Sequence, residues 1–237
     1  MRKFLTALLT LLIVLSAFGC TKPPVEENND EDAARFKTEY ESLNKTEDNK
    51  YREVSINVKN PFYYATVEQI VEKMDKEETF MVYFGANWCP WCRSIIENVI
   101  AKAAEMGITK IYYVDVRPDN DQEKEIRDVY DLDENGKVYL KHAGTDGYHD
   151  FINRAASVLV DYNHGKVTTL DGTEFAGAKR VGAPNYVLVR KGVAIERITG
   201  VSSYQSSPMA ELTDEINEDV KKIFTRFFQD YLDIVKK

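Results

Sequence analysis

Two cysteines separated by two residues are the side chains in this sequence best placed to do chemistry. Cys89 and Cys92 stand in the string Trp88-Cys89-Pro90-Trp91-Cys92, between a compact apolar run and an amphipathic stretch. If that stretch is a helix, the two sulfurs come within bonding distance and Cys89 lies at the helix N-terminus. Unpaired backbone amides and the helix dipole stabilise a thiolate there. Because the thiolate is the nucleophile of thiol–disulfide exchange, we expect Cys89 to be the exposed thiol that attacks, and Cys92 the shielded thiol that resolves the mixed disulfide.

Two other uses of this cysteine spacing are less well supported. A zinc site needs further ligands, but the sequence has no second pair of this kind, and His142, His149 and His164 stand in a later segment without a recognisable motif. A purely structural disulfide would close a very small loop and stabilise the fold little. We therefore expect a redox pair, with no metal and no cofactor.

The third cysteine, Cys20, follows a segment typical of a secretion signal. Residues Met1–Gly19 begin with positive charge and continue with the almost unbroken apolar run Phe4–Leu15, which is too short for a comfortable membrane-spanning helix. Ala17-Phe18-Gly19-Cys20 resembles the bacterial lipobox, which implies that Cys20 is lipidated and becomes the mature N-terminus. The alternative is a plain signal peptide and a secreted protein. In both cases the mature chain lies outside the cytoplasm, where disulfides persist.

Composition indicates a globular domain preceded by a linker. The chain has 237 residues, of which 43% are hydrophobic, and its net charge is −8 with no basic stripe, which argues against nucleic-acid binding. Residues 20–50 are rich in Pro, Glu, Asn, Asp and Lys, so we expect a lipid-anchored disordered linker. A short helix over Ala33–Leu43 is the alternative there, since Phe36 and Tyr40 recur at helical spacing. The domain itself is expected over residues 51–237.

The elements around the cysteine pair alternate between strands and helices. The patterns predict a strand over Glu53–Val58, a helix over Thr66–Asp75, a strand over Thr79–Phe84, a helix over Cys89–Met106 and a strand over Lys110–Val116. This alternation is typical of a parallel α/β core. The elements expected after it are helices at Asp119–Tyr130 and Tyr148–Tyr162, a hairpin at Asp171-Gly172, strands Asn185–Val189 and Ala194–Thr199 joined by Lys191-Gly192, and a helix Pro208–Val235 capped by Ser207.

At this point the chain resembles the thioredoxin superfamily. The resemblance depends on the strand–WCPWC–helix unit and on the later string Val181–Gly192 (VGAPNYVLVRKG), and it covers roughly residues 51–235. It implies that Pro184 is the family's cis-proline opposite the cysteines, and that the backbone of Ala183 pairs with an extended substrate. It also implies a thioredoxin fold, here with a helical insertion at about 117–180 between the third strand and the cis-proline loop.

Neighbouring residues are candidates for substrate contact. Trp88, Pro90 and Trp91 flank the cysteines, with core packing as the alternative for Trp88. Arg93 follows Cys92 and adds positive charge that could lower the pKa of Cys89, although such a residue is often simply solvated.

The sequence departs from the family at two positions and contains one weak calcium motif. Tyr83 stands where thioredoxins have a buried acid, which puts that acid's proton-transfer role in doubt, and the dipeptide between the cysteines is Pro-Trp in place of Gly-Pro. Asp131–Val138 resembles half of a calcium-binding loop, but His142 stands where a bidentate Glu is needed. We interpret that segment as an acidic turn.

The expected function is that of a membrane-tethered thiol–disulfide oxidoreductase outside the cytoplasm. The chain is similar to thioredoxin-like lipoproteins of Gram-positive bacteria, some of them labelled bacteriocin-transport accessory proteins. The resemblance implies exported protein thiols or disulfides as substrates and a membrane partner that recycles the cysteine pair. A non-catalytic accessory protein of an exporter or envelope assembly system is the alternative. Oxidases, isomerases and reductases share these residues, so the direction of electron flow stays open.

Overall fold

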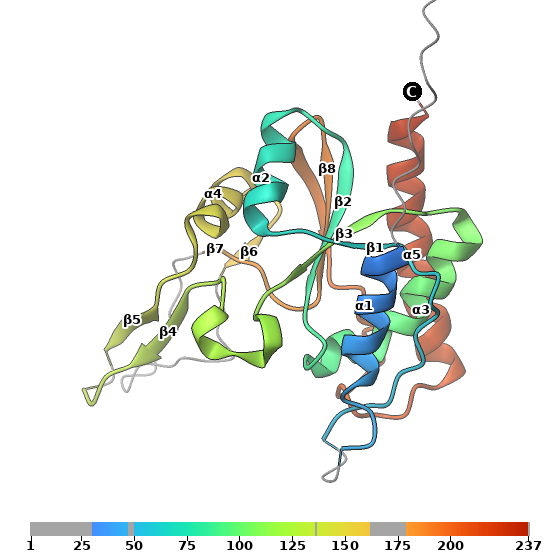
Figure 1. Ribbon diagram of the computed structural model, residues 1–237, viewed down its shortest axis with the longest axis horizontal. Coiled ribbons are helices and arrows are strands. Elements are labelled where there is room, and N and C mark those ends of the chain that lie inside the picture. Colours follow the sequence, from blue (N-terminus) through green and yellow to red (C-terminus); the bar gives the residue numbers. More distant parts are fainter. Residues whose placement is uncertain (1–29, 47–49, 136, 162–178, 237) are drawn as a thin grey trace, which may run out of the picture.

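A mixed five-stranded sheet forms the centre of the fold (Figure 1). The computed structural model describes residues 30–46, 50–135, 137–161 and 179–236. Within these residues the strand order is β1-β3-β2-β8-β9. β1, β3 and β2 run parallel to one another, while β8 is antiparallel to β2 and β9 is antiparallel to β8. The strands span Phe62–Tyr64 (β1), Phe80–Gly85 (β2), Ile111–Asp115 (β3), Asn185–Arg190 (β8) and Val193–Ile198 (β9).

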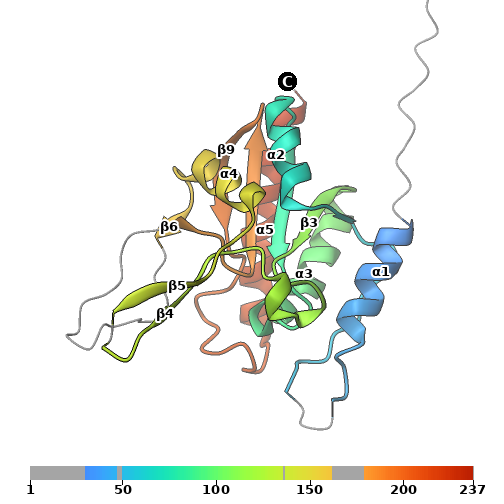
Figure 2. The same ribbon diagram turned by 60° about the vertical axis from the view of Figure 1, so that its left-hand side comes forward.

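Helices cover both faces of this sheet. In Figures 1 and 2, α2 and α4 lie on one face, and α1, α3 and α5 lie on the other. α3 packs against α5, and α2 packs against α4. The helices span Asp30–Glu41 (α1), Val67–Asp75 (α2), Pro90–Met106 (α3), Asp146–Ala155 (α4) and Asp214–Val235 (α5).

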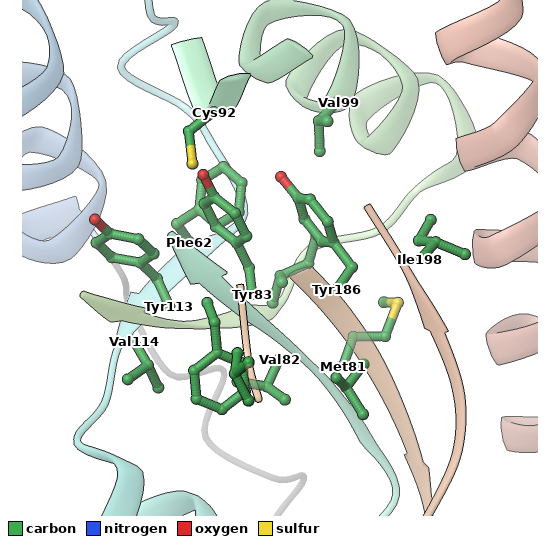
Figure 3. Packing of buried hydrophobic residues seen from close by; sticks show 14 of the residues in the cluster. Phe62, Met81, Val82, Tyr83, Cys92, Val99, Tyr113, Val114, Tyr186 and Ile198 are labelled. Carbon is green, nitrogen blue, oxygen red and sulfur yellow. The ribbon is translucent and has the colours of Figure 1, made fainter. Parts of the chain in front are cut away.

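The central strand β2 is buried on both faces, as its continuous apolar sequence predicts. Its side chains alternate between the two helical layers. Phe84 packs against Phe151 of α4, whereas Tyr83 points toward α3 and stacks on Tyr186 of β8, with ring centroids 4.4 Å apart. This alternation places Tyr83 beneath the helix that holds the cysteine pair (Figure 3).

The folded unit begins earlier than the composition of the chain predicts. Residues 20–50 were expected to be a disordered linker, but the described part of this segment contains helix α1, as the alternative prediction had it. Phe36 and Tyr40 of α1 are fully buried, and Phe36 stacks on Phe62 of β1 at 4.3 Å. Only Ala33, Phe36 and Tyr40 of this helix are buried, and its many exposed polar residues dominate the composition of the segment.

The insertion between β3 and β8 is less helical than expected. The predicted helix Asp119–Tyr130 is wrong: positive φ angles at Asp119 and Asn120 interrupt it. The second predicted helix, Tyr148–Tyr162, is present as the shorter α4, with Thr145 as its N-cap. The other described elements of the insertion are two short 3₁₀ turns at Pro118–Asn120 and Gln122–Lys124, a projecting hairpin of β4 (Val129–Leu132) and β5 (Val138–His142), and the short pair β6 (Val160–Asp161) and β7 (Lys179–Arg180).

Three further expectations need a comment. Glu53–Val58 is not a strand, although Val54 and Ile56 are buried. The last helix begins at Asp214, because Thr213 caps it where Ser207 was expected to. The segment Asp131–His142 folds as the β4–β5 hairpin, which supports the acidic-turn interpretation over a calcium loop between two helices. The hairpin predicted at Asp171-Gly172 lies outside the described residues.

None of the helices within residues 30–46, 50–135, 137–161 and 179–236 is long and apolar enough to span a membrane. The predicted signal segment, residues 1–19, and Cys20 lie outside these ranges.

Candidate functional site

Helix α3 holds the cysteine pair at its N-terminus, as the sequence predicts. Cys89 is the N-cap, Pro90 occupies the first turn, and Gly107 ends the helix in the left-handed conformation with φ 71°. The backbone amide of Cys92 donates a hydrogen bond to the sulfur of Cys89 at 3.3 Å. Cys89 therefore takes the position that Ser or Asp usually takes as a helix cap.

Several groups favour the thiolate form of Cys89. A hydrogen bond from the Cys92 thiol lowers the pKa of Cys89 most, followed by backbone amides at Cys92 and Trp91 and by the charge of Arg127, while burial opposes them. As a thiol, Cys89 donates to the carbonyl oxygen of Ala183 at 3.2 Å. Both cysteines are free thiols here. Groups of this kind around a cysteine stabilise its thiolate, which is the nucleophilic form.

The cysteines differ in environment, though less in exposure than expected. We expected an exposed Cys89, but it is only 4% exposed, and Cys92 is fully buried. The loop that contains Ala183 covers the Cys89 sulfur. Burial raises the pKa of Cys92 well above its usual range, and the neighbouring Cys89 raises it further. Of the two thiols, Cys89 is therefore the one that loses its proton first.

Buried tyrosines surround Cys92 on the side of the sheet (Figure 3). The hydroxyl of Tyr83 lies directly below the Cys92 sulfur and hydrogen-bonds to it, which lowers the pKa of Cys92 against the larger effects of burial. The same hydroxyl lies 2.9 Å from the hydroxyl of Tyr40 on α1. Gly85 makes room for this arrangement, since a Cβ there would lie 2.2 Å from the Tyr83 ring. Tyr83 thus places a neutral hydrogen-bonding group beneath Cys92.

Arg93 does not act on Cys89 as the sequence suggested. Its side chain is 1% exposed and extends away from the cysteines into the N-terminal segment. There the guanidinium donates to four oxygens: the carbonyls of Arg52 (2.6 Å), Tyr40 (2.7 Å) and Asn87 (3.0 Å) and the side-chain oxygen of Asn44 (2.7 Å). Arg93 therefore attaches α1 and the following loop to the helix that holds the cysteine pair.

The cation that does act on Cys89 is Arg127, which belongs to the insertion. Arg127 forms a buried two-point ion pair with Glu125, with nitrogen–oxygen distances of 2.6 and 2.9 Å. Its remaining nitrogen points to the carbonyl of Val181, 3.5 Å away, at the start of the proline loop. The pair is held between the insertion and the loop that faces Cys89.

The peptide bond between Ala183 and Pro184 is cis, as the resemblance implied. Together with Trp91 these two residues line a groove of about 440 Å³ beside the cysteine pair. Parts of the insertion complete the groove, among them Arg127 and Arg180. Helix α4 packs mainly on α2 and also on β9, and its buried Tyr148 hydrogen-bonds to the backbone of Val181 at the start of the proline loop.

The other two predicted contact residues lie apart from the groove. The indole nitrogen of Trp88 donates to the carbonyl of Arg117 at 3.3 Å, and the guanidinium of Arg117 stacks on the indole ring at 3.8 Å. Trp88 is half-buried and packs against the core. Pro90 is half-buried and serves the first turn of α3.

The described histidines have other partners. His142 contacts the carbonyl of Glu125 at 2.6 Å, and His149 contacts the carboxylate of Asp128 at 2.8 Å. No group of three or more His, Cys, Asp or Glu side chains in the described part of the chain is arranged to hold a metal ion. His164 lies outside that part.

Three residues of the site escaped the sequence prediction: Tyr40, Arg127 and Arg197. The first two reach the cysteines from distant segments, and no local pattern marks them. Arg197, which lines the groove, could have been found from the hairpin at Lys191-Gly192, because the register of that hairpin returns β9 to the beginning of β8.

A scan against protein-family models finds no match for this chain, and a search of curated proteins also finds none. What can be said of the site therefore comes from the arrangement of its own residues. That arrangement combines a thiol at a helix N-terminus, a second thiol one turn further on, and a cis-proline loop beside a groove.

Proposed function

We propose that this protein is a thiol–disulfide oxidoreductase with a thioredoxin fold, tethered outside the cytoplasm. The observation that carries the proposal is the position of Cys89. Its sulfur lies among donors that lower its pKa, with Cys92 one turn further along and the carbonyl of Ala183 3.2 Å away. A structural cysteine pair requires neither a stabilised thiolate nor an adjoining groove.

The sheet also supports the thioredoxin fold. Parallel β1, β3 and β2 are followed by an antiparallel β8–β9 hairpin, with helices on both faces and a cis-proline at the beginning of β8. Helix α1 and the insertion would then be additions to this fold.

The chemistry follows from the two thiols. The Cys89 thiolate attacks one sulfur of a substrate disulfide, which forms a mixed disulfide and releases the other substrate sulfur as a thiolate. Cys92 then loses its proton and attacks the Cys89 sulfur. The substrate leaves as a dithiol and the enzyme as a disulfide, so two electrons pass to the substrate. The reverse sequence oxidises a substrate dithiol.

Two variants test this proposal. Cys89→Ser should abolish the reduction of a disulfide-bonded peptide, because the nucleophile is lost. Cys92→Ser should instead accumulate the mixed disulfide, which mass spectrometry detects. If the Cys89→Ser variant still performs the protein's function in cells, the protein is an accessory protein and not an enzyme.

The proposed location depends on Cys20. Lipidation there would hold the enzyme on the extracytoplasmic face of the cell membrane, near exported proteins and near a membrane partner that resets the cysteine pair. Cys20→Ser should release the protein into the medium or leave it unprocessed. Unchanged retention of this variant in the membrane fraction would contradict lipid anchoring.

A further inference from the structure

The groove beside the cysteine pair is positively charged, although the chain as a whole carries a net charge of −8. Among its lining residues are Arg127, Arg180 and Arg197, against one carboxylate, that of Asp161. Asp161 is paired with Lys179 at 2.9 Å. The groove therefore presents more positive than negative charge to whatever enters it.

Arg197 is the arginine that a ligand would most directly engage. Its Nη1 donates to the side-chain oxygen of Asn185 at 2.9 Å, which is a neutral partner. Its Nε is buried and has no hydrogen-bond partner within the described residues. Burial lowers the pKa of Arg197, with no carboxylate among the causes that would raise it. A buried donor without an acceptor is costly, and a charged acceptor compensates it best.

The other charged groups near Arg197 already have partners. Glu196, its neighbour in β9, is paired with Arg226 at 2.9 Å. Arg127 is neutralised by Glu125 at 2.6 Å. Arg197 therefore has a neutral partner, Asn185, where a carboxylate would be expected. Asn185 is itself buried and directly follows Pro184.

From this geometry we infer that the groove recognises a carboxylate near the reacting cysteine of a protein substrate. An extended segment that pairs with the backbone of Ala183 and reacts with Cys89 would place its flanking residues over the groove. An Asp or Glu within about three residues of the substrate cysteine could then reach Arg197, since an extended residue spans about 3.3 Å. The inference rests on the proposed function and adds a substrate class: segments in which an acidic residue accompanies the cysteine.

The test uses short synthetic peptides with one cysteine carried as a 2-pyridyl disulfide. The neutral leaving group, pyridine-2-thione, adds no charge of its own. Three sets place Glu, Gln or Lys at each position within three residues of the cysteine. When Cys89 attacks the peptide sulfur, a peptide–enzyme disulfide forms, the pyridyl disulfide breaks and the thione is released, which gives the second-order rate constant by absorbance.

We expect the best Glu peptide to react about fivefold faster than its Gln counterpart, equivalent to about 1 kcal/mol. Arg197→Gln should reduce this ratio to near one, and Arg197→Lys should retain much of it because the charge remains. Arg190→Gln is the matched control, since Arg190 is an exposed arginine at the far end of β8 and outside the groove, and it should leave the ratio unchanged. High salt should also reduce the preference for Glu.

The outcomes separate the two proposals. Equal rates for Glu and Gln peptides, or a preference that survives Arg197→Gln, would overturn the acidic substrate class while leaving the oxidoreductase in place. An absence of reaction at Cys89 with every peptide would overturn both. A circular dichroism spectrum and a melting temperature for each variant show whether a lost preference merely reflects unfolding.

Discussion

The hydrogen bond between Tyr83 and Cys92 gives a prediction about the second step of thiol exchange. In that step the Cys92 thiolate attacks the sulfur of Cys89, and burial makes this thiolate hard to form. The hydrogen bond from the Tyr83 hydroxyl stabilises the Cys92 thiolate and so offsets part of the cost of burial. Tyr83→Phe removes the hydroxyl and keeps the ring in its stack on Tyr186.

The size of the effect follows from the strength of such a bond. A hydrogen bond to a charged group contributes about 1.5–3 kcal/mol, so its loss makes the Cys92 thiolate harder to form and raises the pKa of Cys92 further. The fraction of Cys92 present as thiolate then falls about 10- to 100-fold. A more basic thiolate is also a better nucleophile, so the logarithm of the rate constant falls by only a little more than half as much as that of the thiolate fraction. We expect resolution to slow by about 4- to 12-fold.

Reaction with dithiodipyridine measures this step directly. Cys89 releases one pyridine-2-thione in a fast phase, and the attack of Cys92 releases a second one in the next phase. Tyr83→Phe should slow the second phase and leave the first nearly unchanged. Tyr113→Phe is the control, because the Tyr113 hydroxyl is buried in the same cluster and has no hydrogen-bond partner within the described residues.

Stability separates the chemical role from a structural one. Tyr83→Phe leaves the Tyr40 hydroxyl without its partner at 2.9 Å, which should cost about 1–3 kcal/mol. In the double variant Tyr40→Phe/Tyr83→Phe both hydroxyls are gone, so stability should largely return while resolution stays slow. A second phase as fast as that of the unmodified protein, or one slowed equally by Tyr113→Phe, would refute the reasoning.

Three further predictions follow from charges near the site. Replacing Arg127 and Glu125 together by Gln removes the cation near Cys89 without leaving Glu125 buried and unpaired, and it should raise the pKa of Cys89. The rate of alkylation against pH measures this, and a profile that does not move to higher pH would contradict a net effect of the ion pair. Burial raises the pKa of Asp115 to about 6, above the unfolded value of about 3.9, so the folded state holds this proton more tightly and stability falls as pH rises through about 6. The two pKa values differ by about two units, so Asp115→Asn should stabilise the protein at pH 7 by about 3 kcal/mol and make little difference at pH 4, as urea unfolding at the two pH values would show. The reduction potential of the Cys89–Cys92 couple should be about −200 mV, above the roughly −270 mV of thioredoxin, because the stabilised Cys89 thiolate favours the reduced form. Equilibration with a glutathione buffer measures this potential. A value at or below that of thioredoxin would favour a reductase.

The parts of the fold that the sequence predicts correctly are set by local signals. The cap Thr66, the helix that begins after Cys89 and the glycine at 107 each depend on neighbours within one helical turn. The hairpin at Lys191-Gly192 is equally local. These signals place the two cysteines in their positions before any tertiary contact is known.

The residues that the sequence does not reveal depend on long-range contacts. Tyr40 meets Tyr83 across 43 positions of sequence, and nothing near either residue indicates the other. The segment Asp119–Tyr130 has a helical pattern, but the buried pair Glu125–Arg127 ties it to the proline loop and overrides the local preference. Polar composition likewise concealed the anchors of α1, because a few buried residues hardly change an average.

The four acceptors around Arg93 have a practical consequence for anyone who shortens this chain. A fragment that begins at Tyr51, where the composition changes, would lose the Tyr40 carbonyl and the Asn44 side chain. A buried guanidinium would then keep only two of its acceptors, and Phe62 would lose the ring stacked on it. Such a fragment should express poorly or aggregate, whereas one that begins at Asp30 retains these contacts. The useful boundary for expression is thus set by Arg93, next to the cysteine pair, and it lies about 20 residues before the first position at which the sequence looks globular.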